Sequence, residues 1–181
     1  MISKNTGAGI LIASLLLPTL AHAGPVYDLD DYGVIIHKKT NSAKPFMQVN
    51  AGYGKFDNGE KTNALDYTLG INVPVASDYS LDVAVYHSNL GKQNDFKVKG
   101  YGLRTSLKNS MSEKSSLGIN LGAGFTKQQQ VEGAQLSAGL GYEYLITPSL
   151  AWNINAEYYF YAANSDSKWK GASTGIRFYF K

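Results

Sequence analysis

Six charged residues stand out because each interrupts a stretch of apolar, glycine and small polar residues. They are Asp66, Asp82, Arg104, Glu143, Glu157 and Arg177. Carboxylates and guanidinium groups gathered in one polar interior have two possible uses. They can line a pathway or gate for ions or protons, or they can neutralise one another in a network of ion pairs and hydrogen bonds. Because buried charges are rarely tolerated without partners, we favour the network.

The pair His87-Ser88, in YHSNLG, is a second candidate, because a histidine can act as the base that activates a serine. Catalysis needs both side chains on one face, whereas adjacent residues of a strand point to opposite faces. No acidic residue accompanies them in phase, and His37 is equally isolated. The sequence therefore predicts no catalytic residue, no metal ligand and no cofactor.

Lysines that flank predicted loops are the third candidate. They are Lys55, Lys61, Lys92, Lys97, Lys99, Lys127, Lys168 and Lys170. An ammonium group pairs well with phosphate, so these lysines are suited to a phosphate-bearing surface. We single out Lys92, Lys97, Lys99, Lys168 and Lys170 as candidate phosphate contacts. The alternative is a solvated rim that only keeps the loops in solution.

A repeating alternation of apolar and polar residues indicates the strands that position these residues. In LDYTLGINVPV, from Leu65 to Val75, every second residue is apolar, which is the pattern of a strand with one apolar face. The pattern recurs and predicts eight strands, near 45–55, 63–75, 79–89, 96–108, 115–126, 133–146, 149–162 and 168–180. Short turns alternate with longer polar loops between them, as in an up-and-down barrel.

The two faces of these strands differ in a way that favours a membrane over a soluble sheet. The apolar face is aliphatic in the middle, and the opposite face is rich in Gly, Asn and Ser but poor in Lys and Glu. A soluble sheet also alternates, but it normally carries charge on its water face. A sheet in hydrocarbon must close so that no backbone group is left unpaired. The predicted fold is therefore all-β: an eight-stranded antiparallel up-and-down transmembrane β-barrel with a polar, side-chain-filled lumen.

Aromatic residues on the apolar face gather near the strand ends. The loop-end belt contains Tyr53, Tyr101, Phe125, Tyr158 and Phe160, and the turn-end belt contains Tyr79, Tyr142, Tyr144, Trp152, Phe178 and Phe180. Amphipathic rings prefer the boundary between lipid and water, so two such belts mark the edges of an apolar band.

The N-terminus and the composition indicate the compartment. Lys4, an apolar run from Ile10 to Leu17 and the sequence Ala21-His22-Ala23 fit a secretory signal peptide, so we expect residues 1–23 to be removed. Residues 24–43 form a leader that precedes the barrel of residues 44–181. The leader is either a periplasmic segment that docks on a partner, a disordered stretch or a cover for the barrel mouth. The chain has no cysteine, and its net charge of +3 does not indicate a nucleic-acid binder.

With these hairpins, the turn LITPSL and the final strand GIRFYF, the sequence resembles the small eight-stranded outer-membrane barrels of Gram-negative bacteria, the OmpX-like and OmpA-type barrels. The resemblance implies the bacterial outer membrane, with outer-membrane lipids and lipopolysaccharide as the surroundings. It also implies that the barrel-assembly machinery reads an aromatic residue at the end of the chain. Here Phe180 is penultimate and Lys181 is last, which departs from that pattern.

The resemblance is weak for activity, because this fold carries many functions. The leading hypothesis is a non-catalytic barrel with a structural, barrier or interaction role at the cell surface. The alternatives are a narrow channel for ions or small solutes, and a lipid-A-modifying enzyme of the barrel class.

Overall fold

The computed structural model describes residues 27–29, 35–38, 42–129, 131–161 and 168–180. The predicted signal peptide and its cleavage site lie outside these residues. The strands of the described part are β1 (Tyr27–Leu29), β2 (Ile35–Lys38), β3 (Lys44–Phe56), β4 (Lys61–Pro74), β5 (Tyr79–Gln93), β6 (Phe96–Ser110), β7 (Ser115–Gln128), β8 (Val131–Thr147), β9 (Leu150–Tyr161) and β10 (Trp169–Tyr179). No helix among the described residues is long and apolar enough to cross a membrane.

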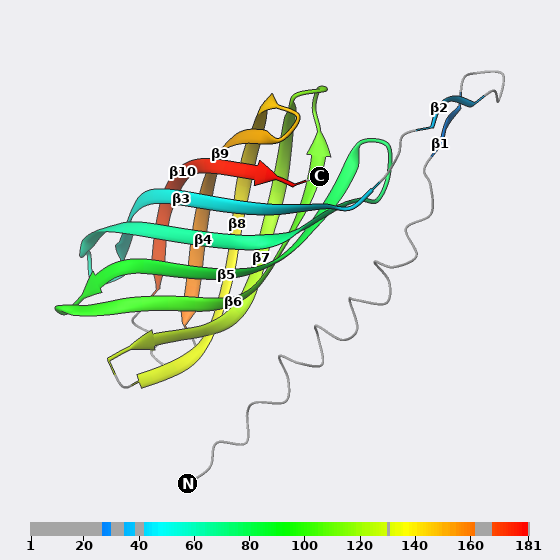
Figure 1. Ribbon diagram of the computed structural model, residues 1–181. Helices are drawn as coiled ribbons and strands as arrows, with labels where there is room; N and C mark the ends of the chain where they lie inside the picture. Colours follow the sequence, from blue (N-terminus) through cyan, green and yellow to red (C-terminus); the bar gives the residue numbers. More distant parts are fainter. Residues whose placement is uncertain (1–26, 30–34, 39–41, 130, 162–167, 181) are drawn as a thin grey trace, which may run out of the picture.

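Strands β3 to β10 form one closed antiparallel barrel, in which each strand pairs with its neighbour in the sequence. β10 closes the barrel by pairing with β3 from Trp169, opposite Phe56, to Tyr179, opposite Phe46; the two strands lie side by side in Figure 1. β1 and β2 pair only with each other, in a small sheet within the predicted leader. The predicted eight-stranded up-and-down barrel is confirmed.

The strand boundaries agree with the alternation pattern except on the loop side of β5. The sequence predicted a loop over residues 89–95, but β5 continues to Gln93 and β6 begins at Phe96. A register shift between Asn89 and Lys92 absorbs Gly91, whose φ of 86° is easy for glycine. Asn94 and Asp95 then have φ of 50° and 65°, as the tight two-residue turn of a hairpin requires. Cross-strand pairing of β5 with β6 therefore extends over most of the segment that was predicted to be a loop.

The outward face of the barrel is apolar in the middle. Leu69, Leu121 and Leu136 are 58%, 56% and 61% exposed. Such exposure of large aliphatic residues over many strands is unfavourable in water, so lipid is the solvent that suits this face. On β4, Tyr67 and Ile71 are exposed as predicted, while Val73 is an exception, because it is buried.

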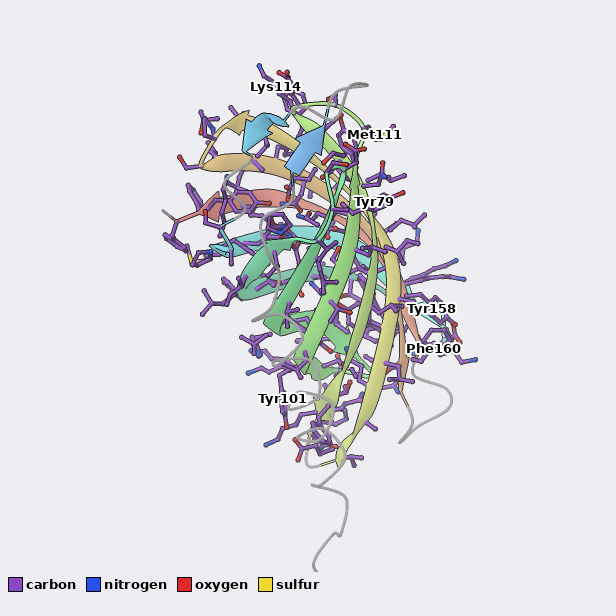
Figure 2. All side chains as sticks on the ribbon, turned by 90° about the vertical axis from the view of Figure 1, so that its right-hand side faces the viewer. Tyr79, Tyr101, Met111, Lys114, Tyr158 and Phe160 are labelled. Carbon is purple, nitrogen blue, oxygen red and sulfur yellow. The ribbon has the colours of Figure 1, made fainter. Side chains whose placement is uncertain are left out.

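The residues of the two predicted aromatic belts are exposed or half-buried on the outer face. In Figure 2, Tyr79 lies toward the turn end of the barrel, near Met111 and Lys114 of a turn, whereas Tyr101, Tyr158 and Phe160 lie farther toward the loop end. Tyr158 and Phe160 also contact each other edge to face, with ring centroids 4.4 Å apart. The outer face therefore has an apolar band with rings toward both ends.

Candidate functional site in the barrel lumen

Near the turn end, four charged side chains from four strands meet inside the barrel and form the turn-side cluster. It consists of Asp82 on β5, Lys108 on β6, Glu143 on β8 and Arg177 on β10. Arg177 lies 2.6 Å from Asp82 and 3.1 Å from Glu143, and Lys108 lies 3.0 Å from each carboxylate. Each cation contacts both carboxylates, so the cluster is neutral as a unit.

Neighbouring polar groups and rings hold this cluster in place. Arg177 donates a hydrogen bond of 2.7 Å to Gln48, its cross-strand partner on β3, and Asn72 donates one of 2.6 Å to Asp82. The Tyr179 hydroxyl donates to Glu143 at 2.6 Å. The guanidinium of Arg177 also lies 4.0 Å from the ring centre of Phe46, a cation–π contact. Ion pairs, hydrogen bonds and a cation–π contact therefore hold Arg177 in place.

Farther toward the loops, Arg104 on β6 organises the loop-side cluster with Asp66 on β4 and Glu157 on β9. Its guanidinium lies 3.0 Å from Asp66 and 3.2 Å from Glu157, and it donates a hydrogen bond of 2.7 Å to the Tyr159 hydroxyl. It also lies over the ring of Tyr86, 4.7 Å from the ring centre. Arg104 thus joins opposite walls of the lumen.

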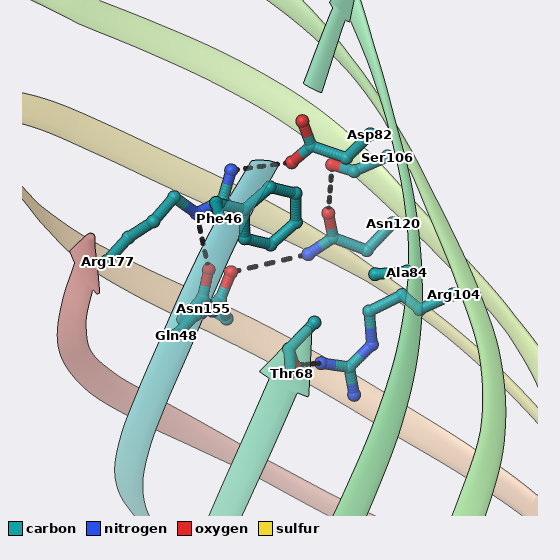
Figure 3. Close-up of a pocket in the computed structure, with 10 residues that line it drawn as sticks. All are labelled: Phe46, Gln48, Thr68, Asp82, Ala84, Arg104, Ser106, Asn120, Asn155 and Arg177. Carbon is teal, nitrogen blue, oxygen red and sulfur yellow. Dashed lines mark hydrogen bonds and ion pairs between the residues drawn. The ribbon is translucent and has the colours of Figure 1, made fainter. Parts of the chain in front are cut away.

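A layer of amide and hydroxyl groups lies beside the two clusters. Asn120 accepts a hydrogen bond of 2.5 Å from Ser106 and donates one of 3.3 Å to Asn155, which in turn donates to Asn153 at 2.9 Å. Figure 3 shows Asn120 and Asn155 between Arg177 on one side and Arg104 on the other. Gln48, which accepts a hydrogen bond from Arg177, donates one of 3.5 Å to Asn153 and so joins this layer to the turn-side cluster.

An apolar cluster fills the loop end of the lumen, and we call it the apolar plug. Its side chains are only 1–3% exposed: Phe56, Tyr86, Leu90, Val98, Tyr159 and Trp169. The Trp169 ring packs edge to face on Tyr159, with centroids 5.5 Å apart. A Cβ atom added at Gly54 or Gly171 would meet this ring, so glycine there leaves room for the indole. Water and ions meet a packed apolar layer at this end.

Two small cavities lie between the polar side chains of the lumen, and each has a volume of about 20 Å³. Asp82, Arg104 and Arg177 line the first, and Lys108, Glu143 and Arg177 line the second. A cavity of this size holds about one water molecule. Neither cavity can hold an organic ligand.

The six charged residues predicted for the lumen all lie inside it, in the two clusters described above. The phase of Asp82 and Arg104 on consecutive strands also predicts that they are cross-strand neighbours, but the two residues are not directly opposed. The register places Asp82 opposite Ser106 and Arg104 opposite Ala84, and each charge has other ion-pair partners. Sequence reasoning also missed Lys108. Lys108 follows Arg104 by an even number of residues on β6, so both side chains face the same side of the strand. This spacing is the signal that could have found Lys108.

His87 and Ser88 point to opposite sides of β5, as predicted from the sequence for adjacent residues of a strand. His87 is exposed on the outer face, in a cross-strand row between Tyr67 and Tyr101. Ser88 is fully buried in the lumen, where its hydroxyl faces the Gly100 carbonyl at 3.5 Å. No group of three metal-ligating acidic or histidine side chains occurs in the described part of the chain.

The predicted phosphate-contacting lysines lie at the loop end. Lys92, Lys97, Lys99 and Lys170 are exposed, while Lys168 is partly covered and lies 4.0 Å from Asp57. Lys92 is directly opposite Lys97, and Lys99 is opposite Lys127. These positions place the ammonium groups beyond the loop-end aromatic residues.

No protein-family model matches the sequence, and no curated protein matches it. Solved structures do. Neisserial surface protein A has a TM-score of 0.57 and 13% identity, over 76% of this chain and 97% of that protein. Ail, the attachment invasion locus protein of Yersinia pestis, has a TM-score of 0.59 and 17% identity, over 78% of this chain and 100% of Ail. Ail in complex with the heparin analogue sucrose octasulfate has a TM-score of 0.58 and 18% identity.

At these identities the likeness establishes the fold and leaves the activity open. The chain has the fold of the small eight-stranded outer-membrane barrels. Its closed sheet and exposed apolar band independently fit a membrane-spanning barrel of that type. The predicted resemblance to outer-membrane barrels is confirmed, and it agrees with the predicted place in the bacterial outer membrane.

Proposed function

We propose that this protein is a sealed, non-catalytic barrel of the outer membrane, with a structural or interaction role at the cell surface. The observation that supports this most is the filling of the lumen. The turn-side cluster, the amide layer, the loop-side cluster and the apolar plug follow one another along the interior. A rigid barrel filled in this way anchors its loops and turns without offering a passage.

The pairing of the lumen charges weighs against a narrow channel. A permeating ion would have to replace contacts such as Arg177 with Asp82 at 2.6 Å and Arg104 with Asp66 at 3.0 Å. Both pairs are buried, so opening them exposes unpaired charge to a low dielectric. The opposite orientations of His87 and Ser88 likewise give no support to a lipid-modifying enzyme.

Conductance in planar bilayers tests this proposal. The wild-type protein is expected to give no discrete current steps. The double variant Phe56→Ala/Trp169→Ala, which removes two aromatic rings of the apolar plug, shows how much current passes once the loop end is opened. Insertion of both proteins is verified by heat-modifiable migration on a detergent gel. Reproducible steps from inserted wild-type protein would overturn the sealed barrel.

The leader of residues 24–43 is proposed to act on the periplasmic side. It precedes β3, whose first residue Lys44 is at the turn end of the barrel, and short turns face the periplasm in barrels of this kind. A peptide of Gly24 to Ala43, immobilised and exposed to detergent-solubilised envelope proteins, is expected to retain a periplasmic protein that a scrambled peptide does not. Equal retention by both peptides would remove the docking role.

A further inference from the structure

Three lysines face outward in one cross-strand row at the loop end, and we call them the lysine triad. Lys55 on β3 is directly opposite Lys61 on β4 and directly opposite Lys170 on β10. All three are exposed. Like charges at directly opposed positions of a sheet destabilise it. A row of three on adjacent strands therefore needs an explanation outside the barrel itself.

Nothing in the described part of the chain neutralises the triad. The ion pairs there include none of these lysines, and the residue opposite Lys170 on β9 is Tyr158. Two further pairs of opposed lysines occur on the described strands: Lys92 with Lys97, which also has no acidic residue across from it but consists of two lysines, and Lys99 with Lys127. Lys127, the partner of Lys99, has Glu132 directly across on β8. The triad is thus a group of three cations without an acidic residue at an opposed position.

The triad also sits at the height where lipid headgroups begin. On β3 the outward residue two positions before Lys55 is Tyr53, which is 55% exposed, and Ala51 precedes it on the same face. Two residues of a strand span about 7 Å, so the ammonium groups lie just beyond the aromatic boundary of the apolar band.

On the side of the triad toward the middle of the barrel, the outer face carries small apolar side chains. Ala172 on β10 is exposed, and it lies directly between Tyr53 on β3 and Ala156 on β9. The two small side chains of Ala172 and Ala156, side by side next to Tyr53, leave room for an acyl chain to lie against the wall. A ligand that is anionic at the height of Lys55 and apolar at the height of Ala172 matches both features.

We propose that the lysine triad is a binding site for the phosphate group of a phosphorylated lipid of the outer leaflet, of the lipid A type, with an acyl chain along Ala172. Three ammonium groups surround one phosphate by charge-assisted hydrogen bonds, which relieves their mutual repulsion. The inference rests on the proposed outer-membrane placement. It narrows the phosphate-contacting residues to one seam and brings in Lys55 and Lys61, which were not among the five singled out from the sequence.

The test measures binding of bisphosphorylated lipid A to the full barrel in phosphatidylcholine nanodiscs. The variant Lys55→Gln/Lys61→Gln/Lys170→Gln is expected to bind about a hundredfold more weakly than wild type. Its matched control, Lys97→Gln/Lys99→Gln/Lys127→Gln, removes the same charge from the same rim and is expected to bind lipid A about tenfold more tightly than the triad variant, because it loses only the general attraction of rim charge. Replacing the triad by arginine keeps the charge and is expected to retain binding.

Each other outcome counts against the site. Equal losses in the two glutamine variants would show a general effect of rim charge. Wild-type affinity in the triad variant, or undiminished binding of dephosphorylated lipid A, would remove the phosphate contact. Displacement of lipid A by millimolar inorganic phosphate would assign the triad to a free anion instead. Heat-modifiable migration of every variant on a detergent gel distinguishes these results from failure to fold. Current steps in the bilayer assay would overturn the sealed barrel but would leave the proposed phosphate site unaffected.

Discussion

Replacement of Arg177 by leucine is the sharpest test of the lumen network. The substitution removes the ion pairs to Asp82 and Glu143, the hydrogen bond to Gln48 and the cation–π contact with Phe46. Leucine fills part of the same space but offers no donor. The two carboxylates then share the single cation Lys108, and the turn-side cluster changes from neutral to a net charge of about −1.

The expected cost follows from burial. The side chain of Arg177 is 8% exposed, and those of Asp82 and Glu143 are 3% and 9% exposed. Solvent therefore screens little of the loss. Removing one partner of a buried ion pair typically costs about 3–5 kcal/mol, because the other partner stays buried without full compensation. We expect the free energy of unfolding of Arg177→Leu to fall by about that amount.

The assay is equilibrium unfolding by urea in lipid vesicles, followed by tryptophan fluorescence and gel migration. Lys168→Gln is the control, because Lys168 and Asp57 are 4.0 Å apart and about 40% exposed, and such surface pairs contribute about 0.5 kcal/mol or less. Asp82→Leu/Arg177→Leu removes both members of the pair and leaves Lys108 with Glu143. It is expected to be more stable than the single variant.

Two results would refute this reasoning. A single variant within about 1 kcal/mol of wild type would mean that Arg177 is not part of a stabilising network. A double variant no more stable than the single one would mean that the loss comes from altered packing and not from the uncompensated carboxylate.

Two further predictions test the outer wall and the apolar plug. Leu121→Arg, at an outward position that is 56% exposed, is expected to lower the free energy of unfolding in vesicles by about 2–4 kcal/mol, because it places a cation in the hydrocarbon. Leu121→Ala is the control, and equal losses in the two variants would contradict a lipid-facing position. Trp169→Ala is expected to lower the free energy of unfolding by about 3–5 kcal/mol in the same urea titration, since the ring is 2% exposed and packs on Tyr159. A loss below about 1 kcal/mol would show that the apolar plug is not tightly packed.

The strands and their faces could be predicted because alternation is a local property. Leu69 and Asp66 on β4 face opposite sides as a direct consequence of their sequence positions, whatever the rest of the chain does. The end of β5 could not be predicted, because it depends on the conformations of Gly91, Asn94 and Asp95. These residues also occur in open loops, and only cross-strand pairing selects the hairpin.

The partners of the lumen charges could not be predicted either, because they depend on register and on reach across the barrel. Arg104 on β6 contacts Asp66 on β4 and Glu157 on β9, two strands that are not its neighbours in the sheet. Its opposed residue on β5 is Ala84, which is small enough for the guanidinium to extend across the lumen. A sequence gives the face of each charge but not the direction in which a long side chain extends.

The barrel therefore contains cations in two contrasting situations. Inside, Arg177 and Lys108 each contact two carboxylates, because a cation cut off from water is stable only when its charge is matched. Outside, Lys55 has lysines opposite it on both sides, which an exposed side chain tolerates in water but does not favour. If the outer lysines only kept the rim solvated, acidic and basic residues would serve equally well at these positions. The segregation of matched charge in the lumen from unmatched positive charge at headgroup height is what a phosphate-bearing lipid layer would select.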